Sequence, residues 1–315
     1  MGGGTGICPC LRGLNEDRNH VTAIVTVADD GGSSGRLRKD YHIHPPGDIR
    51  NSLVALASAD PLTRSIFDFR FDDSILKGHS FGNLLLAVLT RLTGDFRAAI
   101  DEARLMLSVR HTVLPSTGTR VVLVAGHPDG TKSTGEQVIS KCGKPINHMA
   151  LRPEPGRITE EVEGILAAAD LVVLGPGSLY TSIIPNLLVP GMTETLAKIS
   201  APVVLVGNLM TQPGETDGFT LEDHVQALFE VGGLQRLDAV VQSSSEIPAD
   251  VLGRYQEAEA TPVQASRSAE SLRGARLVEG DIHGLTTDGL IRHDGGRLAA
   301  LLESLSTRGR GAGGN

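Results

Sequence analysis

The feature that most constrains the fold is an alternation between short apolar runs and segments of helical periodicity. The apolar runs are rich in Val and Ile and end in glycine or polar clusters: one begins at Val21, and the others lie at 120–126, 169–178, 201–210 and 236–245. Such runs are typical of strands covered on both faces, as in a parallel sheet. Helical patterns separate them at 82–107, 159–169 and 220–233. The alternation predicts a doubly wound α/β fold with a mainly parallel sheet.

One segment interrupts this alternation. Residues 111–155 contain several prolines and glycines and no long helical pattern. Within them, residues 120–139 have the pattern of two strands joined by a turn at 128–130. We therefore expect a β-rich excursion inside a single domain of residues 1–305, followed by a Gly-rich, disordered tail at 306–315.

Composition excludes several classes of function. A net charge of -8 and only 3% aromatic residues argue against a phosphate-backbone footprint or a base-stacking surface. Three cysteines (Cys8, Cys10 and Cys142) are too few for a disulfide framework and indicate free thiols in a reducing compartment. The longest apolar run, 84–89, is far shorter than a membrane span, and no signal peptide is recognisable. We expect a cytoplasmic protein with no nucleic-acid or membrane partner.

A glycine cluster, "GGGTG", occupies residues 2–6. Glycines before a helix let backbone N–H groups approach phosphate oxygens, and the helix N-terminus adds partial positive charge. The dinucleotide fingerprint is incomplete, because Ile7 stands at the third glycine position. The strand that should precede the cluster is also missing, so either the start is assigned late or another element fills that edge. The residues expected to receive a phosphate are Gly3, Gly4, Thr5 and Gly6.

The stretch "VTVADDGGSSGRLR" at 25–38 places acidic, small and basic residues directly after a predicted strand. Asp29 follows the glycine cluster at about the spacing of the acid that binds ribose in Rossmann-type folds. We expect Asp29 or Asp30 to hold ribose or a metal ion. The hydroxyls and charge expected to meet a pyrophosphate belong to Ser33, Ser34 and Arg38. A solvated loop that caps a helix would explain the serines but not the acid pair.

Two further motifs precede helical patterns. In "PPGDIRN" (45–51), Asp48 is either a helix cap or a ligand-binding or metal-binding acid. In "GHSFGN" (78–83), His79 contacts a ligand, acts as a proton-transfer group or forms a structural hydrogen bond, and Asn83 is a further ligand-binding candidate.

Two more motifs follow the apolar runs of the second half of the chain. "LGPGSLYTSIIPNLLVPG" (174–191) forms a potential anion nest, and "NLMTQPGETDG" (208–218) supplies amide, hydroxyl and acid groups. We expect Gly177, Ser178 and Asn208 to close the far side of the site. Because ligands bind at the carboxyl ends of parallel strands, these loops together predict one shared ligand site.

These motifs, in this order and over nearly the whole chain, resemble the gluconeogenesis-factor (YvcK-type) branch of the CofD-like family. The resemblance implies a Rossmann-like fold and the binding of a nucleotide sugar, UDP-N-acetylglucosamine in the best-understood members, with no cofactor required for binding. It also implies a regulator of gluconeogenic growth, cell shape and cell-wall precursor supply, homo-oligomerisation and a regulatory protein partner of unknown identity.

The sister branch of that family keeps an alternative open. Its phospholactate transferases use a nucleotide-activated donor and Mg²⁺, and their catalytic acid lies in a loop similar to "PPGDIRN". This resemblance implies Asp48 as the catalytic residue, and we expect Asp29 and Asp48 as metal ligands, because Mg²⁺ is commonly held by a few carboxylates beside phosphate groups. A nicotinamide-dependent oxidoreductase is a weaker third hypothesis, because only the glycine cluster and Asp29 favour it.

Overall fold

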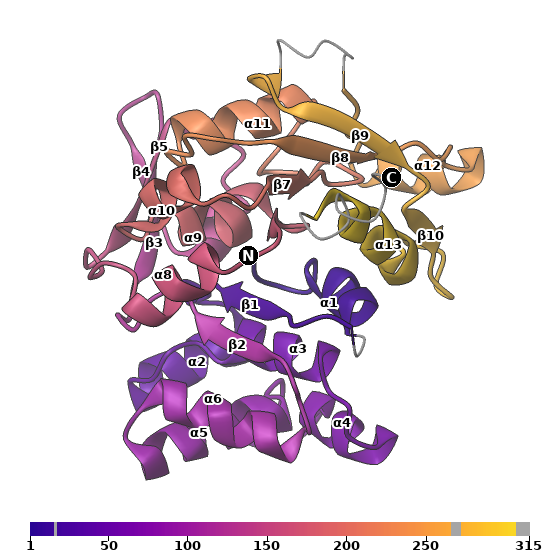
Figure 1. Ribbon diagram of the computed structural model, residues 1–315. Helices are drawn as coiled ribbons and strands as arrows, with labels where there is room; N and C mark the ends of the chain where they lie inside the picture. The colour runs from indigo at the N-terminus through magenta and orange to yellow at the C-terminus, as the bar shows by residue number, and fades with distance from the viewer. Residues whose placement is uncertain (16–17, 266–271, 307–315) are drawn as a thin grey trace.

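The computed structural model describes residues 1–15, 18–265 and 272–306, and its main sheet is parallel with helices packed around it (Figure 1). Four strands follow one another in sequence order: β6 (Val172–Leu174), β7 (Val203–Val206), β8 (Ala239–Ser243) and β9 (Arg276–Gly280). A second parallel pair is formed by β1 (Thr22–Val25) and β2 (Thr112–Pro115). The predicted Rossmann-like α/β class is confirmed. The tail expected to be disordered lies outside the described residues, apart from Ser306.

Met1 and Gly2 join these two groups of strands. The N-terminus lies in the middle of the molecule, near β1 (Figure 1), and Met1 and Gly2 lie between β1 and β6. Four backbone hydrogen bonds hold them there, two on each side: Gly2 N to Ile24 O (3.1 Å), Thr26 N to Gly2 O (3.0 Å), Met1 N to Val173 O (2.6 Å) and Gly175 N to Met1 O (2.9 Å). The glycine cluster therefore leaves the sheet at the edge where β1 and β6 also end.

The helices fall into groups along the chain. The first group is α1 (Cys8–Leu14), α2 (Gly32–Tyr41), α3 (Gly47–Ala55), α4 (Pro61–Asp68), α5 (Phe81–Thr93) and α6 (Phe96–Met106). Of these, α2 to α6 gather beside β1 and β2 (Figure 1). The second group is α8 (Glu160–Ala167), α9 (Ile184–Leu187), α10 (Met192–Lys198), α11 (Leu221–Glu230), α12 (Ala249–Glu257) and α13 (Gly295–Leu305). A π-helical turn covers Leu179–Ile183, and β10 (His283–Leu285) forms a hairpin with β11 (Ile291–His293).

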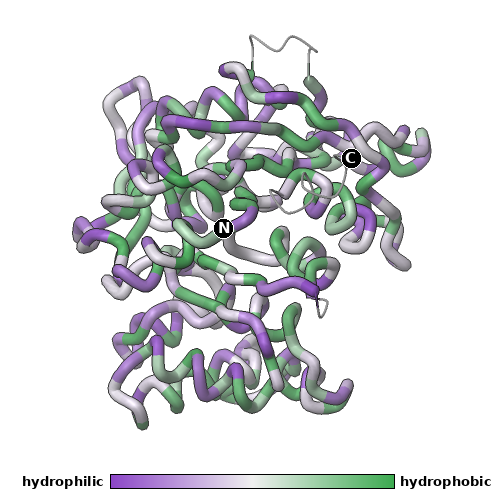
Figure 2. Tube along the Cα trace, viewed as in Figure 1, coloured by the Kyte–Doolittle hydropathy of each residue, from purple (hydrophilic) through white to green (hydrophobic). Residues whose placement is uncertain are grey.

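Strand β7 shows how the core covers both faces of the sheet. All four of its residues are buried. Successive strand residues point to opposite faces, so Val203 and Leu205 join the large core cluster while Val204 and Val206 pack in a second cluster with α13. Figure 2 shows hydrophobic residues along these central strands. No helix in the described residues is both long and apolar enough to cross a membrane.

The β-rich excursion is present but shorter than predicted. Its strands β3 (Val122–Gly126), β4 (Lys132–Thr134) and β5 (His148–Arg152) form an antiparallel sheet in the order β4-β3-β5. The predicted turn joins β3 to β4, with Gly130 at φ +80°. Two expectations need correction: β2 pairs in parallel with β1 and lies outside the sheet of the excursion, and the run at 120–126 is not a parallel strand. Only one face of β3 is fully buried, so it pairs outside the parallel sheet.

The helical pattern at 82–107 forms two helices instead of one. Gly94 takes φ +73° and ends α5, and Asp95 then caps α6 by accepting a hydrogen bond from Ala98 N at 2.7 Å. A glycine in the left-handed region followed by an acidic cap is a common way to end one helix and begin another. The predicted cap of α11 is confirmed, since Thr220 and Asp223 form a reciprocal capping box.

Candidate functional site

A polar cavity of about 320 Å³ lies at the carboxyl end of β1. Its walls come from the loop after β1, from the N-terminal turns of α2, α3 and α5, and from α7 (Glu136–Ile139) in the excursion. The lining residues that carry polar side chains are Asp29, Ser33, Ser34, Asp48, Arg50, Asn51, Arg70, Asn83, Glu136, Gln137 and Ser140. The position agrees with the rule that ligands of open α/β sheets bind beyond the carboxyl ends of the strands.

Two carboxylates, Asp29 and Asp48, form the floor of this cavity. Asp29 Oδ1 accepts a hydrogen bond from Gly31 N at 2.7 Å, and the Asp48 carboxylate accepts one from the Gly4 N–H. Burial raises the pKa of Asp29. Burial and the neighbouring Asp29 raise the pKa of Asp48 to about 7. The pair therefore favours a proton or a bound cation near neutral pH.

A third carboxylate, Glu136, enters the cavity from the excursion. It follows Gly135, which has φ +94°. Burial, and then the carboxylates of Asp29 and Asp48, raise the pKa of Glu136 to about 9. Its Oε2 atom is buried without a hydrogen-bond partner among the described residues. No motif in the sequence marks Glu136. The packing of the excursion brings it to the site, and its spacing from the other site residues follows no rule.

Asp30 holds the excursion in place and does not line the cavity. Its Oδ1 accepts a hydrogen bond from Gln137 N at 3.1 Å. Its carboxylate also lies against Gly135, where a Cβ atom would come within 2.0 Å of Asp30 Oδ2. Of the predicted acid pair, Asp29 faces the cavity and Asp30 positions the segment that carries Glu136.

A hydroxyl and amide wall completes the cavity on the side of α2 and α5. Ser34 Oγ accepts from Gly47 N at 3.1 Å, and its hydroxyl donates to Asp29. Ser33 Oγ lies 3.1 Å from His79 Nδ1 and accepts from Asn83 Nδ2 at 3.2 Å. Asn83 Oδ1 is buried and has no partner among the described residues. His79 thus supports Ser33 from behind, and burial lowers its pKa, which favours the neutral ring.

The arginines that line the cavity do not include Arg38, the cation that the sequence predicted. Arg50 and Arg70 line it, and Arg50 is buried and paired with Asp68. Arg38 is half-buried outside the lining; burial lowers its pKa, and its charged neighbours are Asp30, Arg120 and Asp29. Arg50 stands two residues after Asp48 in the motif at 45–51. This closeness in sequence is the signal that could have identified Arg50 as a site residue.

The remaining predicted residues form a second set of loops beside the cavity. A Cβ on Gly3 would lie 2.7 Å from Asp48 Oδ2, and one on Gly6 would lie 2.8 Å from the Cα of Gly177. Gly177 N donates to Asn208 Oδ1 at 3.3 Å. The glycine cluster therefore connects the carboxylate floor to the loops after β6 and β7.

Three residues extend this second set of loops. Ser178 Oγ accepts from Gln212 Nε2 at 2.7 Å, which ties the loop after β6 to the loop after β7. Thr5 is exposed at the tip of the glycine cluster. Glu215, which the sequence analysis did not select, accepts from Tyr180 N at 2.9 Å, and burial raises its pKa to about 7.

A comparison with known protein families shows which family this chain belongs to. The family described as "2-phospho-L-lactate transferase CofD" matches residues 1–283. This chain belongs to the CofD family. The match includes both sets of loops around Asp48, so the resemblance carried by the sequence motifs is confirmed.

Two relatives of this CofD-family protein and one solved structure are similar over almost their whole length. A gluconeogenesis factor from Bacillus subtilis is 44% identical over 306 residues, which cover 97% of this chain and 96% of the relative. One from Halalkalibacterium halodurans is 44% identical over 305 residues, covering 96% of this chain and 94% of the relative. A crystal structure of a UPF0052-family protein from Bacillus halodurans has a TM-score of 0.91 at 42% identity and covers 96% of this chain and 97% of its own.

The described residues contain no group of three or more His, Cys, Asp or Glu side chains arranged to hold a metal ion. The pair of Asp29 and Asp48 is still compatible with Mg²⁺, which is commonly held by one or two carboxylates and keeps several waters. Burial raises the pKa values of both carboxylates, and a cation held between them would oppose that shift.

Proposed function

We propose that this protein is a gluconeogenesis factor, a regulator that binds a nucleotide sugar of the UDP-N-acetylglucosamine type in the polar cavity and the adjoining loops. Two findings support the proposal: the relatives at 44% identity carry that name, and three of the quoted motifs, at 25–38, 45–51 and 78–83, line one cavity. The role in cell shape and cell-wall precursor supply is part of the same proposal and rests on the resemblance.

Three helices, α2, α3 and α5, begin at this cavity, and the observation that carries the binding proposal is the convergence of the N-termini of α2 and α5 on it. α2 begins at Gly32 and α5 at Phe81, and residues of both first turns line the cavity. Helix N-termini attract phosphate through the helix dipole and through N–H groups that have no other acceptor; in α5 the N–H groups of Phe81 and Asn83 already donate to Phe69 O and Ser80 Oγ. A diphosphate in this hollow would meet the Ser33 and Ser34 side, and the cavity of about 320 Å³ is at the lower end of the range for ligand pockets.

The three carboxylates add a condition to this proposal. A diphosphate beside ionised Asp29, Asp48 and Glu136 would be repelled, so binding needs a proton or a cation between them. The raised pKa values of Asp48 and Glu136 favour uptake of protons. We therefore expect UDP-N-acetylglucosamine to bind more tightly at pH 6 than at pH 8.5 without Mg²⁺, and Mg²⁺ to reduce the difference.

Isothermal titration with UDP-N-acetylglucosamine tests the proposed ligand. Arg70→Ala removes a cation from the cavity wall, and the loss of one charge-assisted contact costs about 1.5–3 kcal/mol, which is roughly tenfold or more in affinity. Arg64→Ala on α4 is the matched control, because Arg64 is exposed and does not line the cavity. No binding by the unchanged protein, or equal affinity in both variants, would count against the assignment.

The alternative function is a phospholactate-transferase-like activity. The observation that favours it is the buried Asp48 next to Asp29, together with the name of the matching family. Mg²⁺ would supply charge neutralisation of a transferred phosphorylated group. The chain's own part would be to hold that ion through Asp29 and Asp48. Product formation from a guanosine-nucleotide-activated phospholactate and a deazaflavin acceptor, lost in Asp48→Asn, would establish it; nucleotide-sugar binding without turnover would exclude it.

A further inference from the structure

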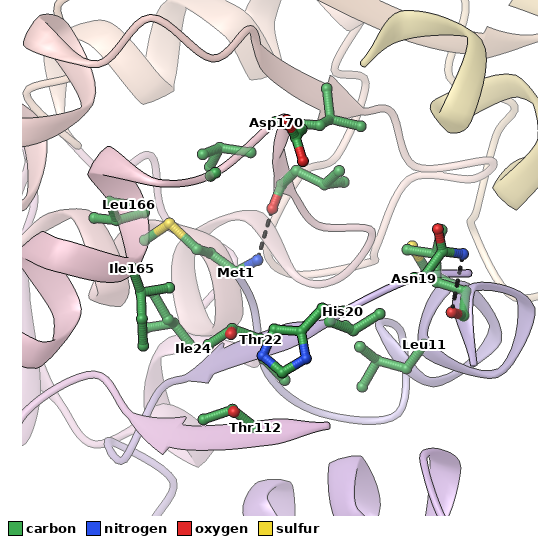
Figure 3. Close-up of a pocket in the computed structure, with 18 of the residues that line it drawn as sticks. Met1, Leu11, Asn19, His20, Thr22, Ile24, Thr112, Ile165, Leu166 and Asp170 are labelled. Atoms are coloured by element: carbon green, nitrogen blue, oxygen red, sulfur yellow. Dashed lines mark hydrogen bonds between the residues drawn. The ribbon is translucent and has the colours of Figure 1, made fainter. Parts of the chain in front are cut away.

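Two cavities of this molecule differ in the groups that their walls offer to a reaction. The larger one, of about 920 Å³, has many apolar side chains in its wall, among them Met1, Ile24 and Leu166 (Figure 3). The polar cavity of about 320 Å³ is lined by Ser33, and an imidazole lies directly behind this hydroxyl, with His79 Nδ1 3.1 Å from Ser33 Oγ. A hydroxyl and an imidazole at this distance have the arrangement of a nucleophile and its general base.

The local sequence around Ser33 has the spacing of a serine nucleophile. Residues 31–35, "GGSSG", match the pattern G-x-S-x-G, in which the serine stands where a strand leads through a turn into a helix. The structure supplies this context, because the chain runs from β1 through residues 26–31 into α2, which begins at Gly32 with φ +46°. Only glycine fits at Gly35, because a Cβ atom there would come within 1.9 Å of Asp30 O. The motif therefore coincides with the turn that presents Ser33 to the cavity.

The hydrogen bonds of Ser33 leave its proton for His79. Ser33 Oγ accepts from Asn83 Nδ2 at 3.2 Å, so its own O–H can donate to His79 Nδ1. The backbone of the histidine is held on both sides, since Phe71 N donates to His79 O and His79 N donates to Leu76 O, each at 2.9 Å. Burial lowers the pKa of His79, which favours the neutral ring. A neutral imidazole held against a hydroxyl is able to take its proton.

The neighbouring hydroxyl of Ser34 already has other partners. Its Oγ accepts from Gly47 N at 3.1 Å, and its hydroxyl donates to the Asp29 carboxylate. The proton of Ser34 therefore points to a carboxylate that helps to form the floor of the cavity, whereas the proton of Ser33 points to a base. Of the two serines in the motif, the hydrogen bonds select Ser33 as the nucleophile.

The place of Ser33 in the first turn of α2 supplies the electrostatic part of a reaction. The N–H groups of Ser33 and Ser34 have no acceptor within their own helix, and amides of this kind stabilise the oxyanion that forms when a carbonyl is attacked. The carboxylates of Asp29 and Asp48 line the same cavity and repel an anionic substrate. The substrate that suits these walls is a small carboxylic ester without negative charge.

We propose that Ser33 is a nucleophile activated by His79 and that the protein hydrolyses a small uncharged carboxylic ester in the polar cavity. Ser33 Oγ forms a bond to the carbonyl carbon while its proton passes to His79 Nδ1, and the carbonyl oxygen takes up the negative charge beside the first turn of α2. The bond from this carbon to the alcohol oxygen then breaks, and the alcohol leaves with the proton from His79. Water attacks the acyl group and gives a proton to His79; the bond to Ser33 Oγ breaks, Ser33 recovers its proton, and the carboxylic acid leaves. This activity goes beyond the proposed function and does not depend on it.

Covalent labelling of the full chain with a fluorophosphonate, followed by mass spectrometry of its peptides, tests the nucleophile. Attack of Ser33 Oγ on phosphorus expels fluoride, so we expect an adduct at Ser33 whose rate of formation rises with pH as the His79 ring loses its proton. His79→Gln should label roughly a hundredfold more slowly or worse. His148→Gln is the matched control, because His148 is exposed on β5 and does not line the cavity. No adduct at Ser33, or the same rate in both histidine variants, would overturn the proposal.

Hydrolysis of 4-nitrophenyl acetate provides the second measurement. Because the acyl group is transferred to Ser33 before water releases it, we expect a burst of nitrophenol followed by slower turnover. Ser33→Ala should lose the burst and roughly a hundredfold or more of the rate, whereas Ser65→Ala, at an exposed position of α4 outside the cavity, should keep both. Equal hydrolysis by these two variants would contradict the role of Ser33. Neither measurement uses a nucleotide sugar, and labelling of the unchanged protein remains decisive if Ser33→Ala does not fold.

Discussion

Gly3 lies in contact with Asp48, because a Cβ atom on Gly3 would come within 2.7 Å of Asp48 Oδ2 and within 2.6 Å of Thr26 Cγ2. Only glycine therefore fits at this position, because a Cβ atom would overlap both neighbouring side chains. The contact links the glycine cluster to the carboxylate floor of the polar cavity, so the conformation of one depends on the other.

The first prediction follows from this contact. Gly3→Ala forces the added methyl group against Asp48 and Thr26, and overpacking of this kind costs about 1–3 kcal/mol. We expect a loss of stability of that size in urea unfolding and a roughly tenfold or larger loss of nucleotide-sugar affinity. Gly118→Ala is the control, because nothing lies within 4 Å of a Cβ at Gly118; equal behaviour of the two variants would contradict the contact.

The second prediction concerns the pH dependence of stability through Asp48. Its pKa is raised from 3.8 to about 7 in the folded protein, so the folded state binds more protons than the unfolded state between these values. The contribution of Asp48 to the free energy of unfolding is therefore greatest below about pH 4, and it is lost as the pH rises through 7. Asp48→Asn removes the ionisation and should stabilise the protein at pH 8, by at most on the order of 4 kcal/mol.

Chemical unfolding of Asp48→Asn at pH 5 and pH 8 measures this effect. The gain over the unchanged protein should be larger at pH 8 than at pH 5. Asp72→Asn, which changes an exposed carboxylate outside the cavity, should show no such difference. A destabilised Asp48→Asn at pH 8 would mean that the carboxylate is held by a compensating positive charge.

The third prediction separates hydrogen bonding from charge at Glu215. Its Oε1 atom accepts from Tyr180 N, and burial raises its pKa to about 7. Glu215→Gln keeps an acceptor oxygen and removes the buried charge, so it should be at least as stable as the unchanged protein at pH 8. Glu215→Ala leaves the Tyr180 N–H unpaired and should lose about 1–3 kcal/mol. Equal unfolding midpoints for the two variants would show that the hydrogen bond is unimportant.

The fourth prediction concerns the junction between α5 and α6. Gly94 has φ +73° and nothing lies within 4 Å of a Cβ there, so Gly94→Ala acts on the backbone alone. An L-residue in the left-handed region costs about 1 kcal/mol, and we expect that loss in urea unfolding. Gly164→Ala inside α8 also meets no atom within 4 Å and should instead stabilise by about 0.5–1 kcal/mol. The same sign for both changes would refute this explanation of the junction.

The sequence predicted the parallel sheet better than the excursion, for a physical reason. Strands β6, β7 and β8 lie inside the apolar runs expected to form them. The run at 120–126 is equally apolar, but it pairs antiparallel and buries one face fully. Apolar length alone cannot distinguish these two situations, because strand pairing is decided by residues far away in sequence.

The site was also only partly predictable. Asp29, Asp48 and Asn83 belong to loops or helix starts that follow recognisable local rules, and they line the cavity. Glu136 and Arg70 line it too, but the packing of separate segments brings them there, and no motif marks them. Homo-oligomerisation, the regulatory partner and the cytoplasmic location stay predictions.

A crystal structure of the protein with UDP-N-acetylglucosamine and Mg²⁺ tests the central claim most directly. The account predicts that the diphosphate lies in the polar cavity, beside the first turns of α2 and α5 and within reach of Ser33, Ser34 and the carboxylate pair Asp29 and Asp48. A ligand bound elsewhere on the molecule, with this cavity unchanged, would contradict it.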